Sequence, residues 1–234
     1  MGLADIHMHS IYSYDGTASV TAILKRAGQV GLDVIAITDH DEINGSLKAL
    51  ELAHKYNVNV IPGIEVTTAE GDLLTLNVTE KIERDRPLIE TVLKVAELGG
   101  FCVAPHPMAG GLGMKSLSAY SILRALREPD VARTLLALET YNATAIDKMG
   151  NHYARILADR LDIPQTASSD AHILEAIGLG ATEFNGHTAQ DFINTLRNGN
   201  INIRKKKEWN SVRILGSWAT QYVGSAFTRL ANAA

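Results

Sequence analysis

The side chains in this sequence that could carry chemistry are histidines and carboxylates placed after short apolar runs. His7 and His9 end the first such run, and Asp170 and His172 follow a later one, each pair two residues apart. Residues two apart on a strand point to the same side, so both members of a pair can meet one ion. Imidazole combined with carboxylate suits zinc, manganese or iron rather than calcium. The eight candidates are His7, His9, Asp15, His40, Glu65, His106, Asp170 and His172.

Eight candidate ligands are too many for one ion of ordinary coordination, so the pattern predicts a cluster of several ions. Each residue taken alone has a simpler explanation. His40 could be a hydrogen-bonded loop residue, Glu65 a surface carboxylate, and His106 part of a rigid turn between two prolines. The joint placement favours the metal site, because five of the eight histidines follow apolar runs. The other three, His54, His152 and His187, are expected to be solvated or capping residues.

These candidates need elements that bring them together, and the chain alternates short apolar runs with helical patterns. The run at 33–38 is typical of a buried strand, whereas 19–31 begins on a good N-cap, Ser19, and ends on Gly31. Strands are expected at 4–8, 33–38, 58–66, 73–78, 101–105, 135–139, 165–169 and 201–204. Helices are expected at 19–31, 45–56, 87–98, 118–127, 145–161 and 189–198.

The repeated order of strand and helix indicates βα units and a mostly parallel sheet. A closed or nearly closed α/β barrel, similar to a TIM barrel, fits this order better than two domains, and an open doubly wound sheet is the second alternative. In a parallel barrel the carboxyl ends of the strands share one face, where the candidate ligands would converge. Residues 1–208 are predicted to form this single barrel domain.

Composition limits the class of protein. The chain has 234 residues, of which 46% are hydrophobic and 21% charged, as in an ordinary soluble globular domain. A net charge of −4 implies no general attraction to nucleic acid, so no stable nucleic-acid binding is expected. The single cysteine, Cys102, excludes an intrachain disulfide and fits a cytoplasmic protein. No signal-peptide pattern and no apolar run long enough to span a membrane are found.

Six blocks of residues resemble the motifs of the PHP family, which is named after polymerase and histidinol phosphatase domains. They occur in order, at family-like spacing, over nearly the whole chain from Ala4 to Arg204. Such a combination is far more specific than any one motif. The blocks are Asp5–Ser10, Ser13–Gly16, Ile37–Asp41, Pro62–Glu65, Ala104–Pro107 and Ser168–His172.

The resemblance implies a distorted (β/α)7 barrel with two or three divalent ions of zinc, manganese or iron. Many relatives have a histidine ligand of the second ion where this chain has Asp72, whose carboxylate is expected to coordinate in its place. The implied ligands of the first ion are His7, His9, Glu65 and Asp170, with Glu65 bridging to a second ion held by His106. The implied ligands of the third ion are Asp15, His40 and His172.

Ions in such a cluster clamp phosphate oxygens and lower the pKa of a bridging water. The expected reaction is hydrolysis of a small phosphate ester or nucleotide by a metal-bridging hydroxide, with a short oligonucleotide as a further substrate class. Glu65, Asp170 and His172 are the expected catalytic residues. Two alternatives stay open, because a fold alone does not decide function. They are hydrolysis of a C–N or carbamate bond, and a non-catalytic metal-binding module.

Four further residues have expected supporting roles. Asp39 and Glu139 end predicted strands and could orient ligand imidazoles, as carboxylates behind metal ligands do. Lys115 and Lys148 are the cations nearest in sequence to the expected site, so they are the candidates for binding a substrate phosphate.

A C-terminal segment, 209–234, lies beyond the barrel pattern. Its apolar residues recur every three or four positions, which predicts an amphipathic helix of about 20 residues. The basic tract Lys205–Lys207 precedes it, but Arg213 and Arg229 are the only cations within it. Attachment to an anionic membrane is therefore the weaker alternative. Packing on the barrel, or pairing with a second chain as a homo-oligomer, is expected instead.

Overall fold

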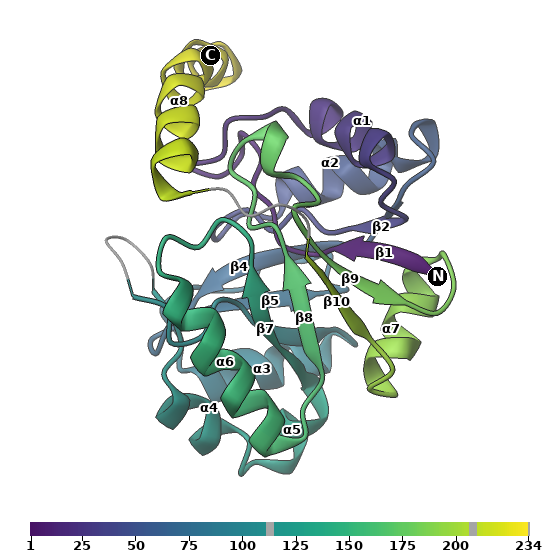
Figure 1. The fold of residues 1–234 in the computed structure, drawn as a ribbon, viewed down its shortest axis with the longest axis vertical. Helices are drawn as coiled ribbons and strands as arrows, with labels where there is room; N and C mark the ends of the chain where they lie inside the picture. The colour runs from purple at the N-terminus through teal and green to yellow at the C-terminus, as the bar shows by residue number, and fades with distance from the viewer. Residues whose placement is uncertain (111–114, 206–209, 234) are drawn as a thin grey trace.

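Two β-sheets of five strands each lie at the centre of the molecule (Figure 1). The computed structural model describes residues 1–110, 115–205 and 210–233. The order in the first sheet is β10 (Asn202–Lys205), β9 (Gly180–Phe184), β1 (Gly2–Asp5), β2 (Val34–Ile35) and β3 (Asn59–Val60). The order in the second is β4 (Gly63–Thr67), β5 (Asp72–Leu76), β6 (Phe101–Ala104), β7 (Leu135–Asn142) and β8 (Gln165–Ser168).

Both sheets mix parallel and antiparallel pairs. Strands β1, β2 and β3 are parallel, as are β6, β7 and β8. In contrast, β9 is antiparallel to β1 and β10, and β5 is antiparallel to β4 and β6. The prediction of an α/β domain is confirmed, and that of a mostly parallel sheet is wrong. The connection from Thr67 to Asp72 shows why, because a parallel crossover needs about a dozen residues or more.

The paired strands of the described chain form two separate sheets and not one closed barrel. Isolated bridges join the sheets, one between Met8 and Ala171 and one between His40 and Glu65. The strand expected at 58–66 is divided between the two sheets, because Pro62 in its middle has no N–H to donate to a ladder. The two bridges bring the segments that follow β1, β2 and β8 close to β4.

Helices pack on the outer faces of the sheets (Figure 1). Those on the first sheet are α1 (Val20–Val30) and α2 (Asn44–Leu52), and those on the second are α3 (Leu88–Glu97), α4 (Ala119–Ala125), α5 (Pro129–Thr134) and α6 (Lys148–Leu161). Ser19 caps α1 as predicted, accepting a hydrogen bond from the Ala22 N–H at 3.3 Å. Strand β9 and helix α5 lie where no element was predicted.

The inner faces of the two sheets pack on each other. Ala4 and Val34 of the first sheet and Leu74, Phe101 and Val103 of the second belong to one fully buried apolar cluster. Helix α7 (Ala189–Arg197) covers one end of this cluster. This packing fixes the sheets relative to each other, so that side chains from both can share one site.

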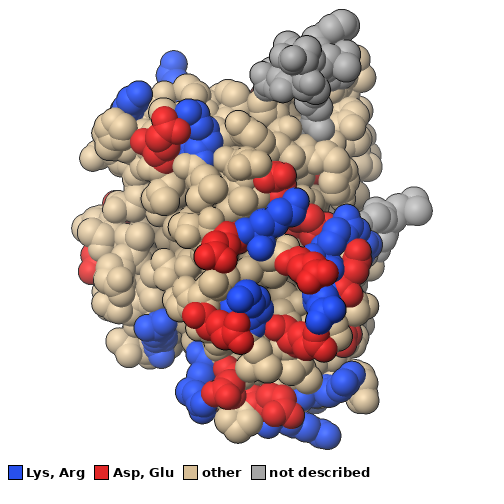
Figure 2. Space-filling view, turned by 180° about the vertical axis from the view of Figure 1, so that it is seen from behind, with Lys and Arg blue, Asp and Glu red and all other residues tan. Residues whose placement is uncertain are grey.

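Helix α8 (Ser211–Ala233) follows the last strand and stands beside the loops at one end of the sheets (Figure 1). Among the described residues, no helix is both long and apolar enough to cross a membrane. On the face seen from behind, Lys and Arg side chains alternate with Asp and Glu (Figure 2). This face therefore carries no large patch of one sign. Ion pairs such as Arg86–Glu90 and Lys94–Glu97 bring opposite charges together.

Candidate metal centre

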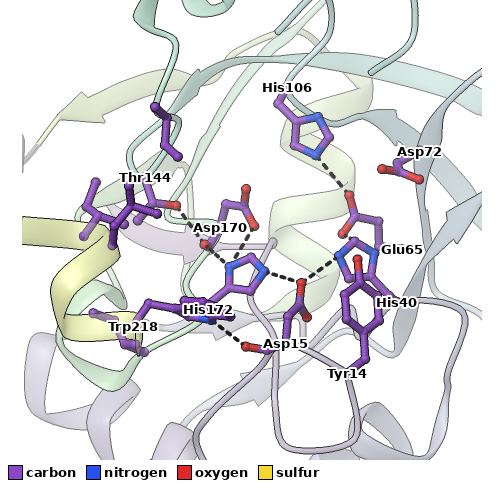
Figure 3. Close-up of a pocket in the computed structure, with 14 residues that line it drawn as sticks. Tyr14, Asp15, His40, Glu65, Asp72, His106, Thr144, Asp170, His172 and Trp218 are labelled. Atoms are coloured by element: carbon purple, nitrogen blue, oxygen red, sulfur yellow. Dashed lines mark hydrogen bonds and ion pairs between the residues drawn. The ribbon is translucent and has the colours of Figure 1, made fainter. Parts of the chain in front are cut away.

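The buried carboxylate of Glu65, on β4, lies at the centre of a group of imidazoles (Figure 3). Its Oε2 atom is 3.2 Å from His7 Nε2, and 3.3 Å from both His9 Nε2 and His40 Nδ1. Its Oε1 atom is 3.1 Å from His106 Nε2. One carboxylate therefore contacts four imidazoles from three different strand ends, which is the position a bridging ligand would occupy.

Asp170 links the two histidines that follow β1. Its Oδ1 atom lies 3.3 Å from His7 Nε2 and 3.2 Å from His9 Nε2, while its Oδ2 accepts a hydrogen bond from Asn142 at 2.9 Å. The backbone of Asp170 is in the left-handed region, with φ 51°. Its N–H donates to the His7 carbonyl at 2.9 Å. This turn after β8 places the carboxylate against the histidine pair.

Asp15 forms a second centre with His40 and His172 (Figure 3). Its Oδ2 atom is 3.0 Å from His172 Nε2 and 3.4 Å from His40 Nε2. The His9 ring stacks on His172, with ring centroids 4.2 Å apart. The loop holding Asp15 requires glycine at the next position, because a Cβ on Gly16 would lie 2.0 Å from a backbone oxygen. The loop therefore brings a distant carboxylate to the strand-end histidines.

His106 follows β6 and points toward Glu65 (Figure 3). Its φ of 29° is another left-handed conformation, and its N–H donates to Glu139 Oε2 at 2.8 Å. The Nδ1 atom is 3.2 Å from the Ser116 hydroxyl, which leaves Nε2 facing the site. The two prolines, Pro105 and Pro107, restrict the backbone on either side of the ring.

The two carboxylates expected to orient ligands behave differently. Glu139 is fully buried, and its Oε1 lies 3.1 Å from His7 Nδ1, so it orients an imidazole as expected. Asp39 accepts from the Ser10 N–H at 2.6 Å and the Ser10 hydroxyl at 2.7 Å. It therefore anchors the loop that follows His9. The sequence reasoning missed Asn142, whose amide donates to both Glu139 and Asp170.

Asp72 lies near the cluster without joining it. It lines the same pocket, but it is in none of the ligand groups found among the described residues. Its Oδ1 atom is buried and has no hydrogen-bond partner in the described chain. Burial and the negative charge of Glu65 raise the pKa of Asp72 to about 6. A buried, unsatisfied carboxylate oxygen is a suitable position for a cation.

The two lysines predicted to bind phosphate do not line this pocket. Lys115 is exposed, and Lys148 donates to the Ala143 carbonyl at 3.1 Å. Most of the glycine loop before Lys115 lies outside the described residues. The other histidines are away from the site as well: His54 contacts the Glu51 carbonyl and His187 contacts Asp33.

The ligand cluster opens into a pocket of about 370 Å³ (Figure 3). His7 and His9, with exposed fractions of 0% and 1%, do not line it, whereas Asp15, His40 and His172 are partly exposed and line it. The pocket is also lined by Tyr14, Thr144 and three residues of α8 that were not predicted for the site. Tyr14 stacks on His40 with ring centroids 5.0 Å apart. The size suits a small organic ligand.

Burial and neighbouring charges shift the pKa values of the clustered carboxylates and imidazoles, and for several groups the two effects oppose each other. Burial would raise the pKa of Glu65, but the imidazoles, led by His40, hold it well below its usual range. Burial and the charge of His172 lower the pKa of His9 to about 4. Burial would also lower the pKa of His172, but Asp15 raises it to about 9. The cluster therefore combines a neutral imidazole, ionised carboxylates and imidazoles that hold protons while no cation is bound.

Three overlapping groups of ligand atoms could hold metal ions, with the atoms of each group within 4.8 Å of one another. The Nδ1 atom of His9 and the Oδ1 atom of Asp72 are buried and have no hydrogen-bond partner among the described residues. Imidazole with carboxylate is a suitable donor set for transition metals. The residues therefore fit a metal cluster. The groups are His7, Glu65 and His106; His7, His9 and Asp170; and His9, Asp15, His40 and His172.

The fold and the site define an α/β domain that gathers metal-ligand side chains at one pocket. The family model described as the PHP domain matches residues 5–161, and a PHP-associated model matches residues 148–201. The chain belongs to the PHP domain family. The resemblance found in the sequence is confirmed.

Three similar proteins place the chain further. An uncharacterised protein of Methanocaldococcus jannaschii is 32% identical over 161 residues, which are 64% of this chain and 88% of that protein. A phosphoribosyl 1,2-cyclic phosphate 1,2-diphosphodiesterase of Eggerthella lenta is 38% identical over 65 residues, 28% of this chain and 24% of that protein. A two-domain protein of Bacteroides vulgatus containing a predicted PHP-like metal-dependent phosphoesterase has a similar fold, with a TM-score of 0.71 and 18% identity. The similarity covers 87% of this chain and 64% of that protein.

Proposed function

We propose that this chain is a metal-dependent phosphoesterase that hydrolyses a small phosphate ester or nucleotide. The observation that carries the proposal is the convergence of three ligand groups on one pocket, with Glu65 in contact with four imidazoles. Two or three divalent ions of zinc, manganese or iron would occupy these groups. When bound, they would supply Lewis acidity to phosphate oxygens and to water.

The residues of the chain would hold, orient and screen the reacting groups. His7, His9, Glu65 and Asp170 would form the inner site, and Asp15, His40 and His172 the site nearer the opening. His106, with Asp72, would complete the site on the other side of Glu65. No lysine or arginine lines the pocket among the described residues, so a substrate phosphate would depend on bound cations for its charge balance.

The comparisons support an ester of phosphoric acid as the substrate class. The Eggerthella relative is named as a diesterase of a cyclic phosphate, and the fold is similar to that of a predicted phosphoesterase. The distorted barrel expected from the family and a cytoplasmic location belong to the same proposal. The isolated bridges between the two sheets are what would close such a barrel.

The test is a substrate panel on protein stripped of metal and reloaded with Mn²⁺ or Zn²⁺. The panel contains phosphate monoesters, a cyclic phosphodiester, nucleotides, short oligonucleotides, and amide and carbamate substrates. We expect metal-dependent release of phosphate or opening of the cyclic ester, with the amides untouched. Hydrolysis of the amide or carbamate alone would replace the proposal with C–N bond hydrolysis. Full metal occupancy without turnover of any substrate would favour a binding module.

A further inference from the structure

Helix α8 forms one wall of the pocket that holds the ligand cluster. Ile214, Leu215 and Trp218, on one side of this helix, line the pocket together with Asp15 and His172. Figure 3 shows Trp218 beside Asp15 and His172, with Glu65 and His106 on the far side of the pocket. The matched family regions end at residue 201, so this wall is built by a segment beyond them.

Specific contacts hold the described part of α8 against the loops of the domain. The indole N–H of Trp218 donates to the backbone carbonyl of Asp15 at 2.9 Å, and its ring packs on the apolar cluster under α1. One turn further on, the Gln221 amide donates to Glu175 at 2.8 Å. Through these contacts α8 packs on the domain of its own chain, which is one of the two arrangements expected for the C-terminal segment. Pairing with a second chain stays an untested prediction, and membrane attachment stays the weaker alternative.

The wall has the chemistry of a site for an apolar group. Ile146 and Ile173, from two other loops, join the three residues of α8 in lining the pocket. Glu65, Asp72 and His106 lie on the opposite side of the pocket, with Asp15 and His172 between them and the wall (Figure 3). With no lysine or arginine among the described lining residues, the wall offers nothing to additional phosphates or carboxylates of a substrate.

From this arrangement we infer that α8 selects the alcohol portion of the substrate. The preferred substrate is a phosphate ester of an aromatic or other apolar alcohol, not a sugar phosphate or a polyphosphate. The inference rests on the proposed function, because the phosphate is taken to lie at the ligand cluster. The apolar alcohol portion of the substrate would then lie against Leu215, Ile214 and the ring of Trp218. Removing apolar surface from water favours this placement in proportion to the area buried.

The test compares two substrates in the full-length, metal-loaded protein: phenyl phosphate and glycerol phosphate. Leu215→Ser and Ile214→Ser should lower the kcat/KM ratio of phenyl to glycerol phosphate by about tenfold, because a hydroxyl replaces the apolar contact. Trp218→Phe, which keeps an apolar ring but loses the indole N–H, should retain most of the preference. Val212→Ala and Val223→Ala are matched controls on exposed positions of the same helix, at 80% and 68% exposure, and should leave the ratio unchanged.

A binding measurement separates this inference from the proposed function. Phenylphosphonate and methylphosphonate have no ester bond to hydrolyse and share the same phosphonate group, so the difference between their affinities in calorimetry reports the wall. We expect the phenyl compound to bind at least about tenfold more tightly, and Leu215→Ser to remove the difference. That result without ester hydrolysis would support the wall and contradict the phosphoesterase. If the protein hydrolyses esters but neither Leu215→Ser nor Ile214→Ser changes the substrate ratio, the phosphoesterase is supported and the role of the wall is contradicted.

Discussion

The ligand cluster and the α8 wall share one pocket but are built in different ways. The inner ligands lie on or directly after strands of both sheets, and His7, His9 and Glu65 are almost completely buried. The wall is presented by one helix whose Leu215 is 48% exposed and which the domain holds through contacts around Trp218 and Gln221. A cluster cross-linked in this way cannot lose one member without disturbing others. The wall, in contrast, can change while the cluster stays intact, so the chemistry and the choice of substrate are separable.

The largest expected effect is that of Glu65→Gln. The amide keeps the size of the side chain but removes the negative charge that four imidazoles contact. Metal content should fall by more than one ion per chain, and phosphoesterase activity by several orders of magnitude. Elemental analysis and turnover are measured beside Glu97→Gln, an exposed surface control. A Glu65→Gln protein with wild-type metal content and turnover would show that Glu65 bridges nothing.

The next effect in size is that of Glu139→Gln. Glu139 does not line the pocket of the ligand cluster, but its Oε1 lies 3.1 Å from His7 Nδ1 and its Oε2 accepts the His106 N–H, so it orients two candidate ligands. Changes of this kind weaken metal binding by about 10- to 100-fold. Metal titration of the stripped protein should show that loss, with the apolar substrate preference unchanged. Equal metal affinity in the wild-type and Glu139→Gln proteins would reduce Glu139 to a structural role. Glu90→Gln, at an exposed position, is the control.

Metal uptake should release protons and strengthen as pH rises. Burial would lower the pKa of His40, but Glu65 and Asp15 raise it to about 10, as Asp15 raises that of His172 to about 9. Both imidazoles therefore hold protons at neutral pH and must lose them to bind an ion. Calorimetry in two buffers of different ionisation enthalpy counts these protons, and affinity should increase as pH rises toward about 9. His187→Gln should behave as wild type, and uptake independent of pH would contradict the protonation described.

The sequence predicted which histidines and carboxylates come together better than it predicted the sheets that hold them. His7 and His9, or Asp170 and His172, are informative because spacing of two and position after an apolar run are local properties. The pairing partners of strands are not local, so the antiparallel β9 and the division of the chain at Pro62 were missed. The short connection before Asp72 could have revealed the antiparallel β4–β5 pair, since its length alone excludes a crossover.

The wall was the least predictable part of the site. The apolar spacing in 209–234 predicted a helix but contained nothing about which surface it meets. The surface that the helix meets is determined by hydrogen bonds from Trp218 to Asp15 and from Gln221 to Glu175, which join residues far apart in sequence. Trp209 lies outside the described residues, as do the side chains of Ala226, Phe227 and Leu230.

The smallest expected effect is at Asp72, which lines the pocket but belongs to neither the ligand groups of the described chain nor the α8 wall. It lines the pocket from β5, yet its buried Oδ1 has no partner among the described residues. Burial and Glu65 raise its pKa to about 6, so above that pH its charge opposes folding while no cation is bound. Asp72→Asn should therefore stabilise the metal-free protein at neutral pH, a gain that shrinks as pH falls below about 6 because Asp72 itself becomes protonated.

The metal-loaded protein should respond to the same substitution in the opposite direction. If Asp72 ligates an ion, Asp72→Asn weakens that ion and lowers the melting temperature of the loaded protein, while Asp72→His restores both. Melting curves of stripped and loaded protein, with metal analysis, test both signs at once. A higher melting temperature in both states, with unchanged metal content, would make Asp72 a buried charge without a ligand role. The ligand cluster would then end at Glu65 and His106, and the side of the pocket at β5 would be free to contact substrate.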